Sequence, residues 1–174
     1  LQRVLKALED DVRSRVQESE AIDASLREQH DKAKAASRTA QAYEVWRDDY
    51  ITQVAVAWIL GCVFVRFLED NGLIETTWLA GPGHRLQLAR DQHTLYFQQY
   101  PSHSDREYLA HVFDEVTKLP SMRDLLDGDH NPLRKLGPTG DGAHELLNFW
   151  QRIEPTTGLL VHDFTDPQWN TRFL

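Results

Sequence analysis

The sequence predicts an all-α fold, a multi-helix bundle around one central buried helix at about residues 51–69. Three observations lead to this prediction: apolar residues recur at helical spacing, the central stretch is apolar on nearly every side, and glycine and proline separate the periodic segments. The 174 residues are enough to bury a core, and no internal repeat or flexible linker divides them. We therefore expect residues 1–174 to form a single helical domain.

Two helices are expected in the first part of the chain. The apolar residues of the first recur at helical spacing with charges between them: Leu1, Val4, Leu5, Leu8, Val12 and Val16. The second stretch, from Ile22 toward Ala36, carries more charged and small residues. Such composition is typical of a solvated helix or of the far arm of a helical hairpin.

The centre of the chain is different, because ITQVAVAWILGCVFVRFL, from Ile51 to Leu68, is apolar almost all round. Gln53 and Arg66 interrupt it, and the uninterrupted part is shorter than the roughly 18 residues of a membrane span. A helix that is apolar on every side belongs in the middle of a core. We expect Gly72 to end this helix in the left-handed conformation.

Shorter helices are expected in the second half of the chain. One runs from about His84 to Gln99, and Ser104 with Glu107 has the spacing of a capping box that starts the next. A short helix is expected from Ser121 to Leu126. Residues 127–142 are rich in Gly, Pro and Asp and predict a loop. The last helix carries Leu146, Leu147, Phe149 and Trp150, and Leu159 to Val161 is a weak strand candidate.

Charge and cysteine content narrow the classes of partner and compartment. The chain contains 19 Lys and Arg residues and 27 Asp and Glu residues, which gives a formal net charge of -8. An acidic chain is at a disadvantage in non-specific DNA binding, which depends on cations that neutralise phosphates. The single cysteine, Cys62, excludes an internal disulfide, and residues 1–11 lack the apolar run of a signal peptide. We therefore expect a cytoplasmic location and no membrane partner.

The motifs of common reaction centres are absent from the sequence. The eight histidines form no His-Glu-x-x-His pair and no tight cluster with Cys62, and no Gly-x-Ser-x-Gly elbow is present. The glycine-rich segment 137–142 lacks the lysine of a phosphate loop. Glu115 and Lys118 are one residue too far apart for the Glu-x-Lys pair of metal-dependent nucleases. We predict no catalytic, cofactor-binding or metal-binding residue in this chain.

One local match to amino-methyltransferases fails on inspection. These enzymes use a loop of Asn, Asp or Ser followed by Pro-Pro and an aromatic residue, which holds the flipped target base. The chain has Asp166-Pro-Gln-Trp169, in which Gln168 replaces the second proline, and no glycine-rich loop for S-adenosylmethionine precedes it. We interpret Asp166 as a helix cap with Pro167 at the first helical position.

Four stretches together resemble the N-terminal region of the PglX family, adenine-specific DNA methyltransferases of phage growth limitation and type 2 BREX phage defence. They are residues 43–73, which contain YEVWRDD and VAVAWILGCVFVRFLEDNGL, then WLAGPG at 78–83, HNPL at 130–133, and HDFTDPQWNTRFL at 162–174. The resemblance implies that the full enzyme binds S-adenosylmethionine and methylates N6 of adenine in DNA. It also implies that the cofactor and catalytic motifs lie downstream of Leu174.

Part of this resemblance has a physical explanation of its own. The element from Arg66 to Gly72 is similar to segments in helical regions of other large modification methyltransferases. Arg66 stands three and four residues before Glu69 and Asp70, a spacing that brings their side chains together on a helix. We expect this trio to support the end of the central helix.

Three hypotheses about function follow. The first is a scaffold or interaction module for the methyltransferase core of the same polypeptide or for other phage-defence subunits, with exposed aromatics among Trp46, Trp58, Trp78 and Trp169. The second is an auxiliary domain that helps orient duplex DNA. Its candidate contacts are the basic residues Arg85, Arg90, Arg123, Arg134 and Lys135. The third, an independent enzyme such as a nuclease, has no motif to support it.

Overall fold

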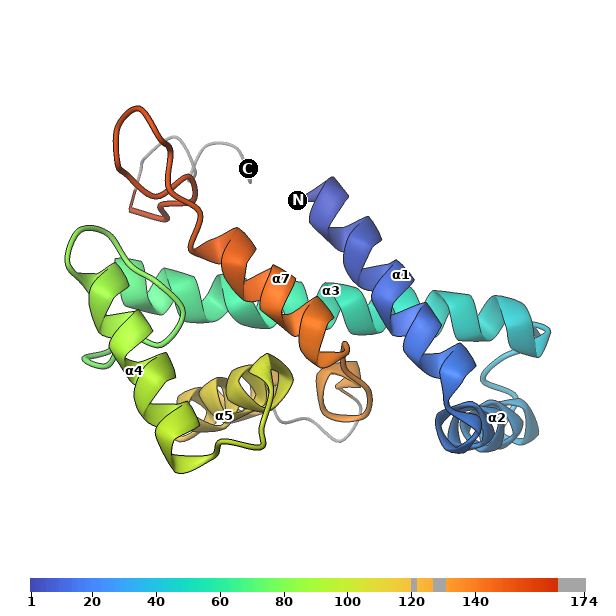
Figure 1. Cartoon of the computed structure of the whole chain (residues 1–174). Coiled ribbons are helices and arrows are strands. Elements are labelled where there is room, and N and C mark those ends of the chain that lie inside the picture. Colours follow the sequence, from blue (N-terminus) through green and yellow to red (C-terminus); the bar gives the residue numbers. More distant parts are fainter. Residues whose placement is uncertain (120–121, 127–130, 166–174) are drawn as a thin grey trace.

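The computed structural model describes residues 1–119, 122–126 and 131–165, and in these residues the chain is helical (Figure 1). The all-α prediction is confirmed. The elements, in chain order, are α1 (Gln2–Glu18), α2 (Glu20–Ala35), α3 (Tyr43–Asp70), α4 (Arg85–Gln99), α5 (Asp105–Thr117), α6 (Arg123–Leu126), the 3-10 helix η1 (Pro132–Arg134) and α7 (Gly140–Trp150).

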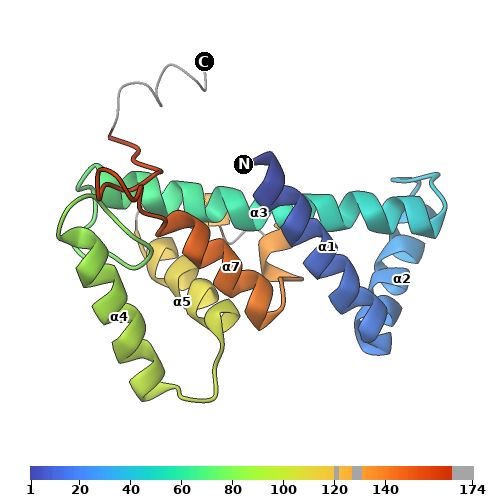
Figure 2. The same cartoon turned by 45° about the horizontal axis from the view of Figure 1, so that its top comes forward.

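Helix α3 is the axis of the molecule. Figures 1 and 2 show α1 and α7 side by side across α3, with α2 near its first turns and α4 and α5 toward its other half. The centre of the core is aromatic: Trp58 of α3 packs edge-on against Phe113 of α5 at 5.5 Å between ring centroids, and Trp150 of α7 is fully buried. Trp58 Nε1 also donates to the carbonyl of Leu136 at 3.0 Å, which satisfies its polar atom inside the core.

Helix α3 begins at Tyr43, eight residues before the predicted start at 51. Residues 43–50 carry several charges, so they do not continue the all-round apolar pattern. Their aromatic side chains nevertheless share one face, since the rings of Trp46 and Tyr50 stack at 5.3 Å. Tyr43 donates a hydrogen bond to Asp23 Oδ1 at 2.6 Å, which fixes the first turn of α3 on α2. This tertiary contact explains why the helix is longer than predicted.

The length argument against a membrane span was wrong. By length and composition alone α3 qualifies as a span, with a mean hydropathy of 2.0 over its most apolar window. Half of that window is nevertheless buried within the protein, under α1, α5 and η1. Arg66 and Glu69 near its end are also fully buried against protein partners. These contacts favour the interpretation of α3 as a core helix, but one that is not covered on every side.

The shorter elements follow the sequence signals closely. The capping box is confirmed: the backbone N–H and the hydroxyl of Ser104 donate to Glu107 Oε2 at 2.8 and 2.5 Å. The predicted loop 127–142 is shorter than expected, because it contains η1 and because α7 starts at Gly140. The strand candidate forms a single antiparallel bridge between Ile153 and Leu160. The expected caps Ser121 and Asp166 lie outside the described residues.

Candidate functional site

A buried ionic cluster joins the end of α3 to the C-terminal part of the chain. Arg66 donates to both carboxylate oxygens of Asp70, the closer at 2.8 Å, and to the carbonyls of Trp150 and His162 at 2.8 and 2.7 Å. Asp70 in turn accepts the backbone N–H of Phe164 at 2.8 Å. The predicted structural role of this trio is therefore confirmed.

Glu69 forms the second half of this cluster. Its carboxylate accepts the backbone N–H groups of Trp78, Leu79 and Ala80 at 2.6, 2.8 and 3.1 Å. Burial raises the pKa of Glu69 to about 7, and the three amide donors and Arg66 oppose that rise. The side chain fixes the loop that follows α3 and has no exposed surface for a ligand.

The five basic residues predicted for DNA contact belong to several elements and make different contacts. Arg85 donates to the carbonyls of Glu69 and Ile74, so it closes the C-terminal end of α3. Arg90 of α4 contacts Gln151 at 3.5 Å, and Arg123 is exposed at the start of α6. Only Arg134 and Lys135 line a common cavity. Arg85, Arg90 and Arg123 do not line this cavity, and DNA contact by any of the five residues stays a prediction.

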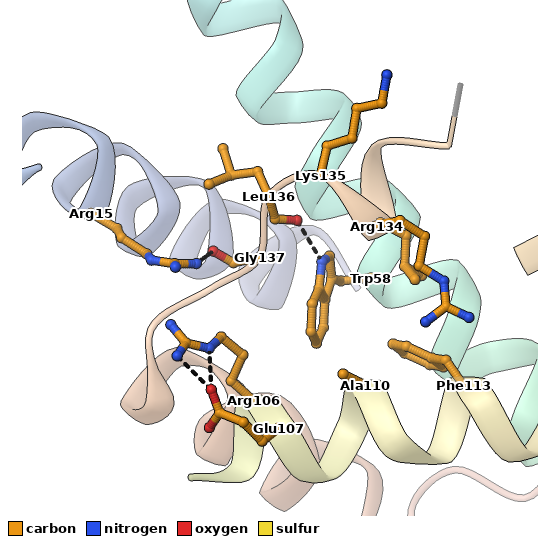
Figure 3. A pocket seen from close by; sticks show the side chains of 11 residues that line it. Arg15, Trp58, Arg106, Glu107, Ala110, Phe113, Arg134, Lys135, Leu136 and Gly137 are labelled. Atoms are coloured by element: carbon orange, nitrogen blue, oxygen red, sulfur yellow. Dashed lines mark hydrogen bonds and ion pairs between the residues drawn. The ribbon is translucent and has the colours of Figure 1, made fainter. Parts of the chain in front are cut away.

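The cavity beside Arg134 and Lys135 has a volume of about 250 Å³ (Figure 3). Its apolar wall comes from α3, α5 and η1, and includes Trp58 and Phe113. Two further cations, Arg15 of α1 and Arg106 of α5, line the same cavity. Figure 3 shows these two guanidinium groups on one side of the cavity and Arg134 on the other. Four cations from three separate parts of the chain therefore line one cavity.

The cations around this cavity differ in how far they are neutralised. Arg106 pairs with Glu107 at 2.5 Å, and Arg134 pairs with Asp114 at 2.6 Å. Arg15 Nη1 donates to the carbonyls of Gly137 and Pro138 at 2.5 and 3.2 Å, with no carboxylate within ion-pair distance among the described residues. Burial, and then the neighbouring charge of Arg106, lower the pKa of the Arg15 guanidinium. Lys135 is exposed and likewise lacks an ion pair in the described part of the chain.

Sequence reasoning missed Arg15 and Arg106. Each lies in a helix with an ordinary amphipathic pattern, and more than 20 residues separate each from Arg134. No local motif marks them. Only the packing of α1 and α5 against η1 and residues 135–137 brings the charges together.

A second feature of the surface is an apolar stripe on α3. Its exposed members are Leu60, Phe64 and Phe67, with exposed fractions of 47, 38 and 44%. The half-buried Val56 and Val63 lie on the same helical face, because these positions recur at spacings of three and four residues. The expectation of a central helix buried on all sides is corrected here. We call this set the α3 stripe.

Of the four tryptophans suggested as exposed, the three in the described residues are at least partly covered. Trp58 is buried, while Trp46 and Trp78 are half-buried. Trp169 lies outside the described residues. The exposed aromatic residues of α3 are instead the phenylalanines of the α3 stripe, because the indoles of Trp46 and Trp58 pack against other rings within the bundle.

Other groups with chemical potential are held in structural contacts. Cys62 is fully buried, and burial raises the pKa of its thiol far above the ordinary value, which keeps it unreactive. No group of three or more His, Cys, Asp or Glu residues in the described ranges is placed to hold a metal ion. Asp105 is buried between His93 and His144, with both distances at 2.6 Å.

Among known proteins, the chain is similar to the adenine-specific methyltransferase PglX of Streptomyces coelicolor (strain ATCC BAA-471 / A3(2) / M145), with 41% identity over 182 aligned residues. The alignment takes in all of this chain but only 15% of that protein, in an N-terminal region. The resemblance to PglX is thereby confirmed. No protein-family profile and no solved structure matches the chain.

Proposed function

We propose that this chain is the helical N-terminal domain of an adenine-specific DNA methyltransferase of bacterial phage defence. In this proposal it is a non-catalytic interaction module that packs against the methyltransferase core of the same polypeptide. The full enzyme would bind S-adenosylmethionine, methylate N6 of adenine in DNA and work in the cytoplasm. The similarity to PglX over the whole chain supports the assignment to such an enzyme.

The observation that carries the interaction role is the α3 stripe. Contiguous exposed apolar side chains on a soluble domain commonly mark a protein-binding surface, and buried aromatic anchors dominate the binding energy of such surfaces. Phe64 and Phe67 supply two such anchors. They project from the helix whose opposite face is fixed by the core, so little conformational entropy is lost when they are covered.

The test is binding between this chain and the separately expressed remainder of the methyltransferase, measured by calorimetry. A double substitution, Leu60→Ser with Phe67→Ser, is expected to weaken binding by at least about tenfold, because it removes two apolar contacts. The matched control is Leu95→Ser on α4, which is equally apolar and 55% exposed but lies off the stripe. Absent binding of the wild type, or equal loss in the control, would contradict the proposal.

A second candidate function is an auxiliary DNA-contacting domain that helps orient duplex DNA. One specific observation favours it: Arg134 and Lys135, predicted from the sequence, lie beside Arg15 and Arg106 around a single cavity. The net charge of -8 opposes DNA binding by the surface as a whole, so such a contact would be confined to this local basic region.

A further inference from the structure

We propose that the cavity between α1, α5 and η1 is a binding site for a phosphate group. Its ligand would be a phosphodiester of a DNA strand or the phosphate of a free nucleotide, which share the same tetrahedral anion. The inference is independent of the α3 stripe, since none of the residues of the stripe lines this cavity.

The first argument is local charge. The cavity is lined by four cations, Arg15, Arg106, Arg134 and Lys135, and by one carboxylate, Glu107. Just outside it, Asp114 pairs with Arg134, and Asp11 faces Arg15 while accepting hydrogen bonds from Thr139. Arg15 and Lys135 thus have no carboxylate within ion-pair distance among the described residues, so their positive charges are not neutralised by an ion pair there. A local excess of positive charge, in a chain whose net charge is -8, favours the binding of an anion at this site.

The second argument is the way in which Arg15 is held. The carbonyls of residues 137 and 138 both accept hydrogen bonds from its Nη1, and these two contacts anchor one edge of the guanidinium. Its Nε and Nη2 still carry three N–H donors, and no described residue accepts from them. A guanidinium that is anchored at one edge and open at the other is arranged for a bidentate contact with an oxyanion.

The third argument is the approach of two like charges. Arg106 lies close enough to Arg15 to lower its pKa, and Figure 3 shows both side chains on the same side of the cavity. Two like charges on one side of a cavity repel, and an anion bound in the cavity relieves that repulsion. The cations reach the hollow from several elements. This arrangement suits a phosphate, which presents acceptor oxygens in several directions, better than a planar carboxylate.

The test measures the affinity of the 174-residue chain for a short fluorescent duplex by anisotropy over a salt series. The variant Arg15→Gln with Lys135→Ala is expected to bind about tenfold more weakly and to lower the salt slope by about 1 to 2, because up to two phosphate contacts are lost. The matched control Lys118→Ala removes an exposed cation at the end of α5 that does not line the cavity, and it is expected to leave affinity and slope unchanged. Circular dichroism confirms that each variant is folded.

Two further titrations distinguish a phosphate of the DNA backbone from the phosphate of a free nucleotide. Titration with inorganic phosphate and with a mononucleotide, followed by NMR of the Trp58 indole that lines the cavity, reports binding of the free anion. The site is assigned to a free nucleotide if the wild type binds inorganic phosphate or the mononucleotide, the double variant does not, and the duplex does not bind. Duplex binding that the variant loses assigns it to the DNA backbone. The proposal is overturned if neither probe binds, if the variant binds as the wild type does, or if only an acidic peptide binds at the cavity.

Discussion

At the scale of single residues, Asp105 shows how one carboxylate can join three helices. It is the first residue of α5, and it accepts hydrogen bonds from His93 of α4 and from His144 of α7. Burial raises the pKa of Asp105, but the hydrogen bonds from the two histidines outweigh burial and hold it below the ordinary 3.8. The folded protein therefore favours the ionised form of this side chain.

A lowered carboxyl pKa predicts a loss of stability in acid. The contribution of Asp105 to the free energy of unfolding is present above its unfolded pKa and is lost as the pH falls through its lower folded pKa. We expect Asp105→Asn to cost about 1–3 kcal/mol at neutral pH, because two charge-assisted hydrogen bonds are lost. Urea unfolding is to be measured at several values between about pH 5 and pH 3, where the wild type should lose more stability than the variant.

The control for this prediction is Asp91→Asn on the exposed face of α4. Within the described residues, Asp91 accepts a side-chain hydrogen bond from Gln87 alone, at 2.8 Å. An exposed contact of this kind contributes little, so the change should be under about 0.5 kcal/mol at either pH. Equal acid sensitivity of Asp105→Asn and the wild type would show that the histidine contacts do not depress the pKa.

At the scale of elements, helical periodicity predicted which segments are helices but not where two of them begin. Periodicity is local and survives any packing arrangement, so α1, α2, α4 and α5 follow it closely. The starts of α3 and α7 depend on contacts between distant residues. Tyr43 is fixed by Asp23, and Thr139 donates to Asp11 while its hydroxyl caps Gly142. A sequence pattern contains no record of such pairs.

The crossing of α3 with α5 and η1 depends on Gly61. A Cβ at this position would lie 2.9 Å from Leu133 Cδ1 and from Phe113 Cε1. Alanine favours a helix over glycine by about 1 kcal/mol, whereas overpacking a core costs about 1–3 kcal/mol. We therefore expect Gly61→Ala to destabilise the protein by about 1 kcal/mol in chemical denaturation. Ser25→Ala on the exposed face of α2 should be neutral or slightly stabilising, and a gain in stability for Gly61→Ala would show that the crossing is loose.

At the scale of the whole molecule, the sequence could predict the resemblance to PglX and the structural trio, but of the two surfaces only two residues of the cavity, Arg134 and Lys135. The segments that resemble PglX are contiguous, and the Arg66 trio lies within one helical turn. The cation cavity joins residues 15, 106 and 134, which no local pattern connects. The α3 stripe was hidden for another reason: an all-apolar helix does not reveal which of its faces the other helices leave open.

The integrity of the C-terminal part depends on Arg66, which binds Asp70 and the carbonyls of Trp150 and His162. Arg66→Met preserves bulk but leaves a buried carboxylate without its cation, a change that costs about 3–5 kcal/mol. We expect that loss in urea unfolding, together with faster amide hydrogen exchange through residues 151–165, which the cluster attaches to α3. Arg13→Met breaks only an exposed pair with Asp10 and should cost under about 1 kcal/mol. If Arg66→Met costs no more than this control, or if its exchange rises equally in α2, the cluster is not what attaches residues 151–165 to the end of α3.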